Sequence, residues 1–194
     1  MKLRDSGMPD EAYWEAMFDV PLVLARLGID GTLGDGMLGD VVELGCGYGT
    51  FSVPIARTIG GTLHTFDVDP AMVARTIERA AELPAGKLDC QLRDVMANGF
   101  GVTGADAALL FNILHCEEPV ALFHHAINAV RPGGQVLVIH WRYGDTPRGP
   151  SLDIRPRPEQ IAAWAQQTGR LVHAGDVIDI PPWHYGWRFR VRAR

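Results

Sequence analysis

The chain has 194 residues, of which 47% are hydrophobic and 21% are charged, and these fractions exclude an intrinsically disordered or fibrous protein. The formal net charge of -5 and the scattered basic residues exclude the basic patch by which proteins bind nucleic acid. No apolar run reaches the roughly 20 residues that cross a bilayer, and residues 1–5 do not begin a signal peptide. We therefore expect one domain in the cytoplasm, with neither a nucleic-acid nor a membrane partner.

The chain begins with helical periodicity. Residues 10–27 carry apolar side chains at helical spacing, and Asp10 is the candidate N-cap. Pro21 allows this segment to divide into two helices. A glycine-rich turn follows, after which the pattern changes to that of a strand. We expect residues 1–39 to form a helical cap on a core of residues 40–194.

The core alternates predicted strands with predicted helices. Short β-branched or apolar runs predict strands at 40–44, 62–66, 88–92, 107–111 and 135–140. Helical patterns, several of them with a proline or a cap at their start, occupy 50–59, 70–83, 117–130 and 158–168. Two final runs, 171–180 and 185–191, are separated by PPWH and predict an antiparallel hairpin. This alternation predicts an α/β fold with a doubly wound, mostly parallel sheet covered by helices on both faces.

The first predicted strand leads directly into the segment VVELGCGYG. The strand provides Glu43, and Gly45, Gly47 and Gly49 follow at alternate positions in a turn that begins a helix. Three glycines allow a backbone to approach a ligand closely. In the dinucleotide-binding pattern G-x-G-x-x-G, Thr50 would replace the third glycine. A tight turn without a ligand is the alternative interpretation.

The pattern E-x-G-x-G-x-G resembles the first motif of the class I, Rossmann-like, S-adenosylmethionine-dependent methyltransferases. The segment FDVDPAMVARTIERA is similar to the acidic second motif of that family, LFNILHCEEP to its fourth motif, and AVRPGGQVLVIHW to the helix, turn and strand that follow. The resemblance spans residues 41–141. It implies a seven-stranded sheet with order 3-2-1-4-5-7-6 and an antiparallel last strand. It also implies S-adenosyl-L-methionine as cofactor and a small-molecule methyl acceptor.

The resemblance implies which residues contact the cofactor. Asp67, at the end of the second strand, would accept hydrogen bonds from the ribose hydroxyls, although the same geometry serves NAD. Asp94, after the third strand, would accept from the adenine amino group. For either carboxylate, a solvated loop residue is the alternative. Asp69 is better explained as a helix cap. The full set of implied cofactor contacts is Glu43, Gly45, Cys46, Gly47, Gly49, Asp67, Val68, Asp94, Val95 and Asn112.

Methyl transfer from a sulfonium is an in-line displacement that depends on alignment, and a base is needed only when the acceptor must lose a proton. His115 follows the fourth strand and is the candidate general base. A structural histidine, with alignment as the whole mechanism, is the alternative. Candidate acceptor contacts, for which core packing or pairing within a loop is the alternative, are Tyr13, Trp14, His140, Trp141 and Arg142.

Three cysteines without C-x-x-C spacing, Cys46, Cys90 and Cys116, predict reduced thiols, and the spacing of cysteine and histidine predicts no metal site. Cys116 is interpreted as an inert, small hydrophobic residue. Two other functions stay open at this point: a nicotinamide-dependent oxidoreductase, and a catalytically inactive module that binds S-adenosylmethionine. The sequence does not identify the acceptor, and it is consistent with a monomer or a homodimer.

Overall fold

The computed structural model of the chain describes residues 8–31 and 36–193. Its strands are β1 (Val41–Leu44), β2 (Leu63–Asp67), β3 (Leu88–Leu92), β4 (Ala105–Phe111), β5 (Val130–Trp141), β6 (Leu171–His173), β7 (Ile178–Ile180) and β8 (His184–Val191). Its helices are α1 (Glu11–Glu15), α2 (Val20–Leu27), α3 (Ser52–Thr58), α4 (Pro70–Arg79), α5 (Val95–Asn98), α6 (Pro119–Ala129) and α7 (Pro158–Gln167). The predicted cap, residues 1–39, includes 1–7 and 32–35, which lie outside the described residues.

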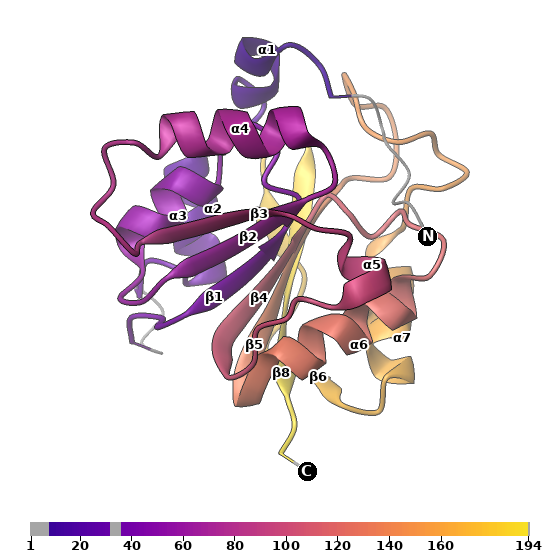
Figure 1. Cartoon of the computed structure of the whole chain (residues 1–194). Coiled ribbons are helices and arrows are strands. Elements are labelled where there is room, and N and C mark those ends of the chain that lie inside the picture. The colour runs from indigo at the N-terminus through magenta and orange to yellow at the C-terminus, as the bar shows by residue number, and fades with distance from the viewer. Residues whose placement is uncertain (1–7, 32–35, 194) are drawn as a thin grey trace.

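The strands of the described chain form one sheet with the order β3-β2-β1-β4-β5-β8-β6, and β7 pairs with β8. Strands β1 to β5 pair in parallel, whereas β8 runs antiparallel to β5, β6 and β7. The predicted doubly wound sheet and its strand order are therefore confirmed, with β8 in the place of the predicted seventh strand. The carboxyl ends of β1, β2, β4 and β5 lie at one edge of the sheet, where open α/β sheets bind ligands (Figure 1).

The predicted strand 171–180 is two strands in the structure. Residues 174–177 separate β6 from β7, and both strands pair with β8. Gly175 has φ +112°, a conformation that L side chains rarely adopt and that interrupts a ladder. The sheet consequently has eight strands where seven were expected.

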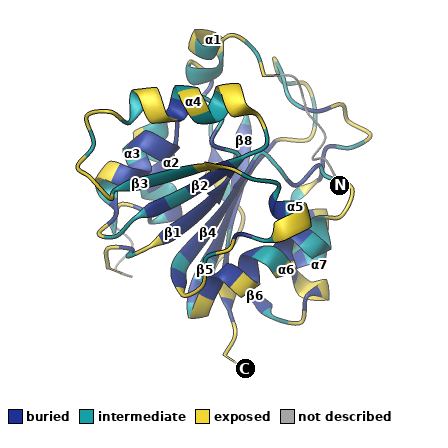
Figure 2. Ribbon diagram, in the orientation of Figure 1, coloured by how far each residue is buried: buried dark blue, intermediate teal, exposed yellow. Residues whose placement is uncertain are grey.

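Helices cover both faces of the sheet, as the strand–helix alternation predicted. α2 and α3 pack on one face, together with the apolar side chains of alternate residues in β1, β4 and β5. α6 and α7 pack on the other face. Figure 2 shows the dark blue, buried central strands between helices whose outer surfaces are exposed. Both faces are thus dry, which explains the almost continuous apolar sequences of β1 and β4.

The helix boundaries agree with local signals in the sequence. Pro21 stands in the first turn of α2, and the Asp19 side chain accepts a hydrogen bond from the Leu22 backbone N–H at 3.1 Å, so the N-terminal segment does divide into two helices. Asp10 caps α1, and Asp69 caps α4 by accepting from Ala71 N at 2.8 Å. The four-residue α5 was not predicted, because so short a segment has no helical periodicity.

Candidate functional site

The loop between β1 and α3 is built from three glycines with left-handed backbone. Gly45, Gly47 and Gly49 have φ values of 86°, 51° and 77°. A Cβ atom on Gly49 would lie 3.2 Å from Thr76 Oγ1 and 3.4 Å from Thr76 Cα, so α4 leaves no room for a side chain there. The Thr76 hydroxyl also donates to Gly47 O at 3.0 Å. The left-handed backbone therefore favours glycine at all three positions, and the close approach of α4 adds a steric reason at Gly49.

Asp67, the last residue of β2, is fixed against this glycine loop. Its Oδ2 accepts a hydrogen bond from Gly47 N at 3.1 Å, and its Oδ1 accepts from Asp69 N at 3.0 Å. A carboxylate has about four lone-pair sites, so both oxygens can accept further hydrogen bonds from hydroxyl groups. The structure thus brings the predicted ribose ligand and the glycine loop together.

Glu43 lies beneath the loop rather than on its surface. The residue is 2% exposed, and its Oε2 accepts from Ser52 Oγ at 2.6 Å and Thr65 Oγ1 at 2.7 Å. Burial raises the pKa of the Glu43 carboxyl to about 7, although the two hydroxyl donors oppose that shift. Glu43 therefore ties β1 to β2 and α3, the elements that support the loop.

Residues after β3 and β4 flank the loop on either side. The Asp94 Oδ1 accepts from Ala97 N at 3.1 Å and caps α5, and Val95 behind it is fully buried. Asn112, directly after β4, has a left-handed backbone with φ 55°, and its buried amide has no hydrogen-bond partner among the described residues. Val68 is half-buried between Asp67 and the start of α4.

Two buried histidines meet at the ends of β4 and β5. His115 is 6% exposed and His140 is fully buried, and their rings pack edge to face with centroids 5.6 Å apart. Burial, followed by the neighbouring His115, holds the pKa of His140 well below its ordinary value. His140 is therefore neutral at physiological pH.

An aromatic cluster adjoins the end of β5. Its members are Trp14, Phe18, Phe51, Trp141 and His184, and we call it the aromatic cluster. The sequence indicated Trp14 and Trp141 but missed the other three, because Phe18 and Phe51 look like core residues and His184 has no motif. Tyr13, a predicted acceptor contact, is 47% exposed. Within the cluster, burial lowers the pKa of His184 to about 3.

Charged and polar contacts connect the N-terminal segment to the glycine loop. Arg75 and Arg79 of α4 both pair with Glu11, at 2.9 and 3.2 Å. Arg79 also donates to Tyr48 O at 3.0 Å, and the Tyr48 hydroxyl donates to Pro9 O at 2.7 Å. α1 therefore packs beside α4 at the same edge of the sheet as the glycine loop (Figure 1).

The arginines after β5 serve the loop itself. Arg155 is 7% exposed and donates to the backbone oxygens of Arg142, Gly144 and Pro150 at 2.6 to 3.1 Å. Arg142, a predicted acceptor contact, pairs with Asp179 of β7 and donates to His184 O at 3.1 Å. Pairing within the loop and with the hairpin is thus the observed state of these two arginines.

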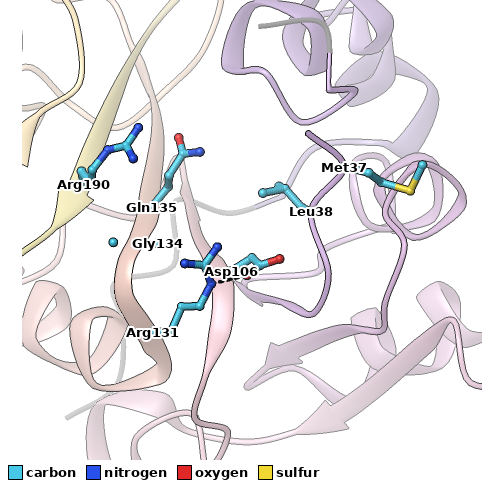
Figure 3. Close-up of a pocket in the computed structure, with 8 residues that line it drawn as sticks. Met37, Leu38, Asp106, Arg131, Gly134, Gln135 and Arg190 are labelled. Atoms are coloured by element: carbon cyan, nitrogen blue, oxygen red, sulfur yellow. Dashed lines mark hydrogen bonds and ion pairs between the residues drawn. The ribbon is translucent and has the colours of Figure 1, made fainter. Parts of the chain in front are cut away.

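A cavity of about 150 Å³ lies at the opposite, amino edge of β4 and β5 (Figure 3). Asp106 and Arg131 form an ion pair at 2.5 Å in its wall, and Gln135 and Arg190 stand beside them. Pockets for small organic ligands usually measure about 300–1,000 Å³, so this cavity is too small for a nucleoside cofactor. Within the described residues, no group of histidine, cysteine or acidic side chains could hold a metal ion.

The carboxyl edge of the sheet fits S-adenosylmethionine. β1 lies between β2 and β4, so the glycine loop is flanked by the Asp67 carboxylate on one side and the Asn112 amide on the other. The carboxylate can accept from ribose hydroxyls, and the amide offers a donor and an acceptor to the polar tail of the cofactor. The loop after β1 does not match the G-x-G-x-x-G pattern of a pyrophosphate cradle, because Thr50 stands at the third glycine position.

Comparisons with known proteins agree with this geometry. Residues 41–134 match the family described as methyltransferase domain. Phosphoethanolamine N-methyltransferase 1 of Triticum aestivum is 29% identical over 137 residues, which are 69% of this chain and 25% of that protein. The chain therefore spans about a quarter of the length of this curated relative.

Solved structures share the fold. A SAM-dependent methyltransferase from Aquifex aeolicus has a TM-score of 0.76 at 17% identity, and the match covers 94% of each chain. The N-methyltransferase NodS from Bradyrhizobium japonicum WM9, in complex with S-adenosyl-L-homocysteine, has a TM-score of 0.69 at 16% identity and covers 93% of this chain and 96% of that chain. Residues 41–134 therefore match a methyltransferase domain, and the chain as described has the fold of these solved methyltransferases.

Proposed function

We propose that this chain transfers the methyl group of S-adenosylmethionine to a small-molecule acceptor. The observation that carries the proposal is the contact between Gly47 N and Asp67 Oδ2, which joins the glycine loop to a strand-end carboxylate. His115 and His140 contact each other at the ends of β4 and β5, at the same edge of the sheet. The names of two relatives, an N-methyltransferase and a phosphoethanolamine N-methyltransferase, support nitrogen as the accepting atom.

The residues have separate roles in this proposal. Asp67 holds the ribose, and Asp94, Val68 and Val95 surround the adenine. When bound, S-adenosylmethionine supplies an electrophilic methyl group whose thioether leaving group needs no proton. His115 takes the proton from an acceptor that must lose one, and the remaining task of the site is alignment. The residues that would hold the polar tail of the cofactor are Gly45, Cys46, Gly47, Gly49 and Asn112.

The setting of the enzyme is part of the proposal. We place the enzyme in the cytoplasm, where it acts as a monomer or homodimer on a small molecule. The net charge of -5 supports the view that nucleic acid is not the acceptor. Residues 1–39 act as the cap of a single domain. In residues 8–31 and 36–193, no helix is both long and apolar enough to cross a membrane.

Thermal unfolding with added ligands tests the proposal. S-Adenosylhomocysteine at about 100 times its Kd is expected to stabilise the protein by about 2.7 kcal/mol, which is about 5–10 °C in melting temperature for a domain of this size. NAD and NADP are expected to have no effect. Stabilisation by NAD without any response to S-adenosylhomocysteine would indicate an oxidoreductase instead. Binding without methyl transfer to any amine acceptor would indicate the inactive module.

Asp67→Ala is expected to weaken S-adenosylhomocysteine binding by more than about tenfold, because a charge-assisted contact to the ribose is lost in a partly buried site. Asp94→Ala is expected to cost less. Isothermal titration calorimetry measures both. Asp69→Ala is the matched control: it removes the cap of α4, which lowers stability by about 1 kcal/mol but leaves the affinity unchanged. Unchanged affinity in both the Asp67 and the Asp94 variant would show that the ribose and adenine positions are wrong.

A further inference from the structure

Four buried polar atoms at the ends of β4 and β5 have no hydrogen-bond partner among the described residues. They are Oδ1 and Nδ2 of Asn112 and Nδ1 and Nε2 of His140. A buried polar group without a partner costs about 1–3 kcal/mol, so folded proteins retain few of them. Both residues are therefore unfavourable for stability as they stand, and a ligand that pairs with them would explain why they are present.

The two side chains belong to neighbouring positions of the sheet. β4 and β5 pair with Phe111 opposite Ile139, and Asn112 N donates to Ile139 O at 2.8 Å. Asn112 and His140 are thus the next residues on adjacent parallel strands. The left-handed backbone of Asn112, φ 55°, is a second feature that costs stability and is typical of ligand sites. This position is directly beside His115.

The surroundings of His140 disfavour a cationic ligand. His140 is fully buried and neutral, and the charged residue that influences it from the loop after β5 is the cation Arg155. His115 and His184 are the other titratable groups that disfavour positive charge there, and the Tyr185 hydroxyl is occupied as a donor to Pro156 O at 2.9 Å. A cationic group would be repelled there, because these neighbours disfavour positive charge.

The aromatic cluster does not provide an alternative cage for a cation. Its rings pack directly against each other, with centroids 4.2 Å apart for Trp141 and His184, 4.5 Å for Phe18 and His184, and 4.9 Å for Trp14 and Phe18. A cation–π site needs an open ring face within about 6 Å of the cation. At each of these three contacts a neighbouring ring fills that position.

We propose that His140 binds the methyl acceptor and that the Asn112 amide lies at the boundary between acceptor and cofactor. The accepting group is an uncharged nitrogen, either an amine in its free-base form or a nitrogen heterocycle. Such a group can donate its N–H to the acceptor nitrogen of neutral His140 or to Asn112 Oδ1, and its lone pair stays free to attack the methyl group. The inference rests on the proposed function, since the acceptor site exists only if the neighbouring edge binds S-adenosylmethionine.

The test uses imidazole as the probe, at a pH where imidazole is uncharged, and the complex of the full chain with S-adenosylhomocysteine. His140→Leu is expected to weaken imidazole binding at least about tenfold while the affinity for S-adenosylhomocysteine stays unchanged. His140→Gln, which keeps a donor and an acceptor, is expected to retain imidazole binding within about threefold. His124→Leu, on the exposed side of α6, is the matched control.

Without ligands, His140→Leu is expected to melt about 2–4 °C higher than wild type, because two unpartnered buried atoms are removed.

The ring-nitrogen NMR signals of His140 in the wild-type complex give a readout that does not depend on the folding of a variant, and imidazole should shift them. Tighter binding of tetramethylammonium than of imidazole would overturn the inference, as would acetate binding that depends on His140. Equal imidazole affinity of wild type and His140→Leu, or no imidazole binding at all, would also overturn it. A wild-type chain that fails to bind S-adenosylhomocysteine would instead overturn the proposed function.

Discussion

His115→Ala is expected to lower turnover about 100-fold with an acceptor that must lose a proton, while affinity for S-adenosylhomocysteine stays nearly intact. The reason is position: His115 follows β4, is 6% exposed, and packs against His140 at the edge where the acceptor is proposed to bind. A positioned base contributes typically about 10²–10⁴-fold, and alignment by the rest of the site would account for the residual rate.

The measurement is a pH–rate profile at saturating cofactor. The pH dependence that a general base gives to the wild-type rate should be absent in His115→Ala. His124→Ala, an exposed histidine of α6, is the control for nonspecific effects. A retained rate with an unchanged profile would mean that alignment alone is the mechanism and that His115 only shapes the site.

Glu43→Gln is expected to remove a pH-dependent loss of stability of about 3 kcal/mol. Burial raises the pKa of Glu43 from 4.5 to about 7, so between these values the folded state binds more protons than the unfolded state. The free energy of unfolding of the wild type therefore falls as pH rises through this window and levels off above pH 7 or so. Glutamine does not ionise, and its side-chain oxygen can still accept from Ser52 and Thr65.

Urea unfolding of the cofactor-free proteins at pH 5 and pH 8 or so measures this effect. At the lower pH the two chains should be nearly equally stable, and at the higher pH the glutamine variant should be more stable. The difference in free energy of unfolding between wild type and Glu43→Gln reports Glu43 alone. Histidines such as His140, whose depressed pKa makes stability rise with pH, contribute equally to both proteins and cancel. Glu78→Gln, at a surface carboxylate with a 71% exposed side chain, is the control. Parallel pH dependence of wild type and Glu43→Gln would show that Glu43 is ionised without cost.

Local signals in the sequence were sufficient for most of the helices and strands but not for the order of the sheet. Asp69 and Pro70 define the start of α4 because a cap and a proline act on the first turn alone. The strand order followed from the family resemblance, and pairing of β8 between β5 and β6 confirms it. The break at Gly175 was missed because alternation of side chains continues across it, and only the backbone geometry shows that the ladder stops.

The candidate site also has features that the sequence determined and features that only the tertiary structure decided. By itself, the sequence determined the glycine loop and the strand-end acids, because their chemistry depends on residue type and spacing along one segment. Tertiary structure alone decided that Glu43 is buried under hydroxyls from α3 and β2, that Arg155 holds the loop after β5, and that Asn112 and His140 are left unpartnered side by side. Each of these states is set by groups from distant segments, and desolvation and hydrogen bonding are determined only once the strands that carry those groups have paired.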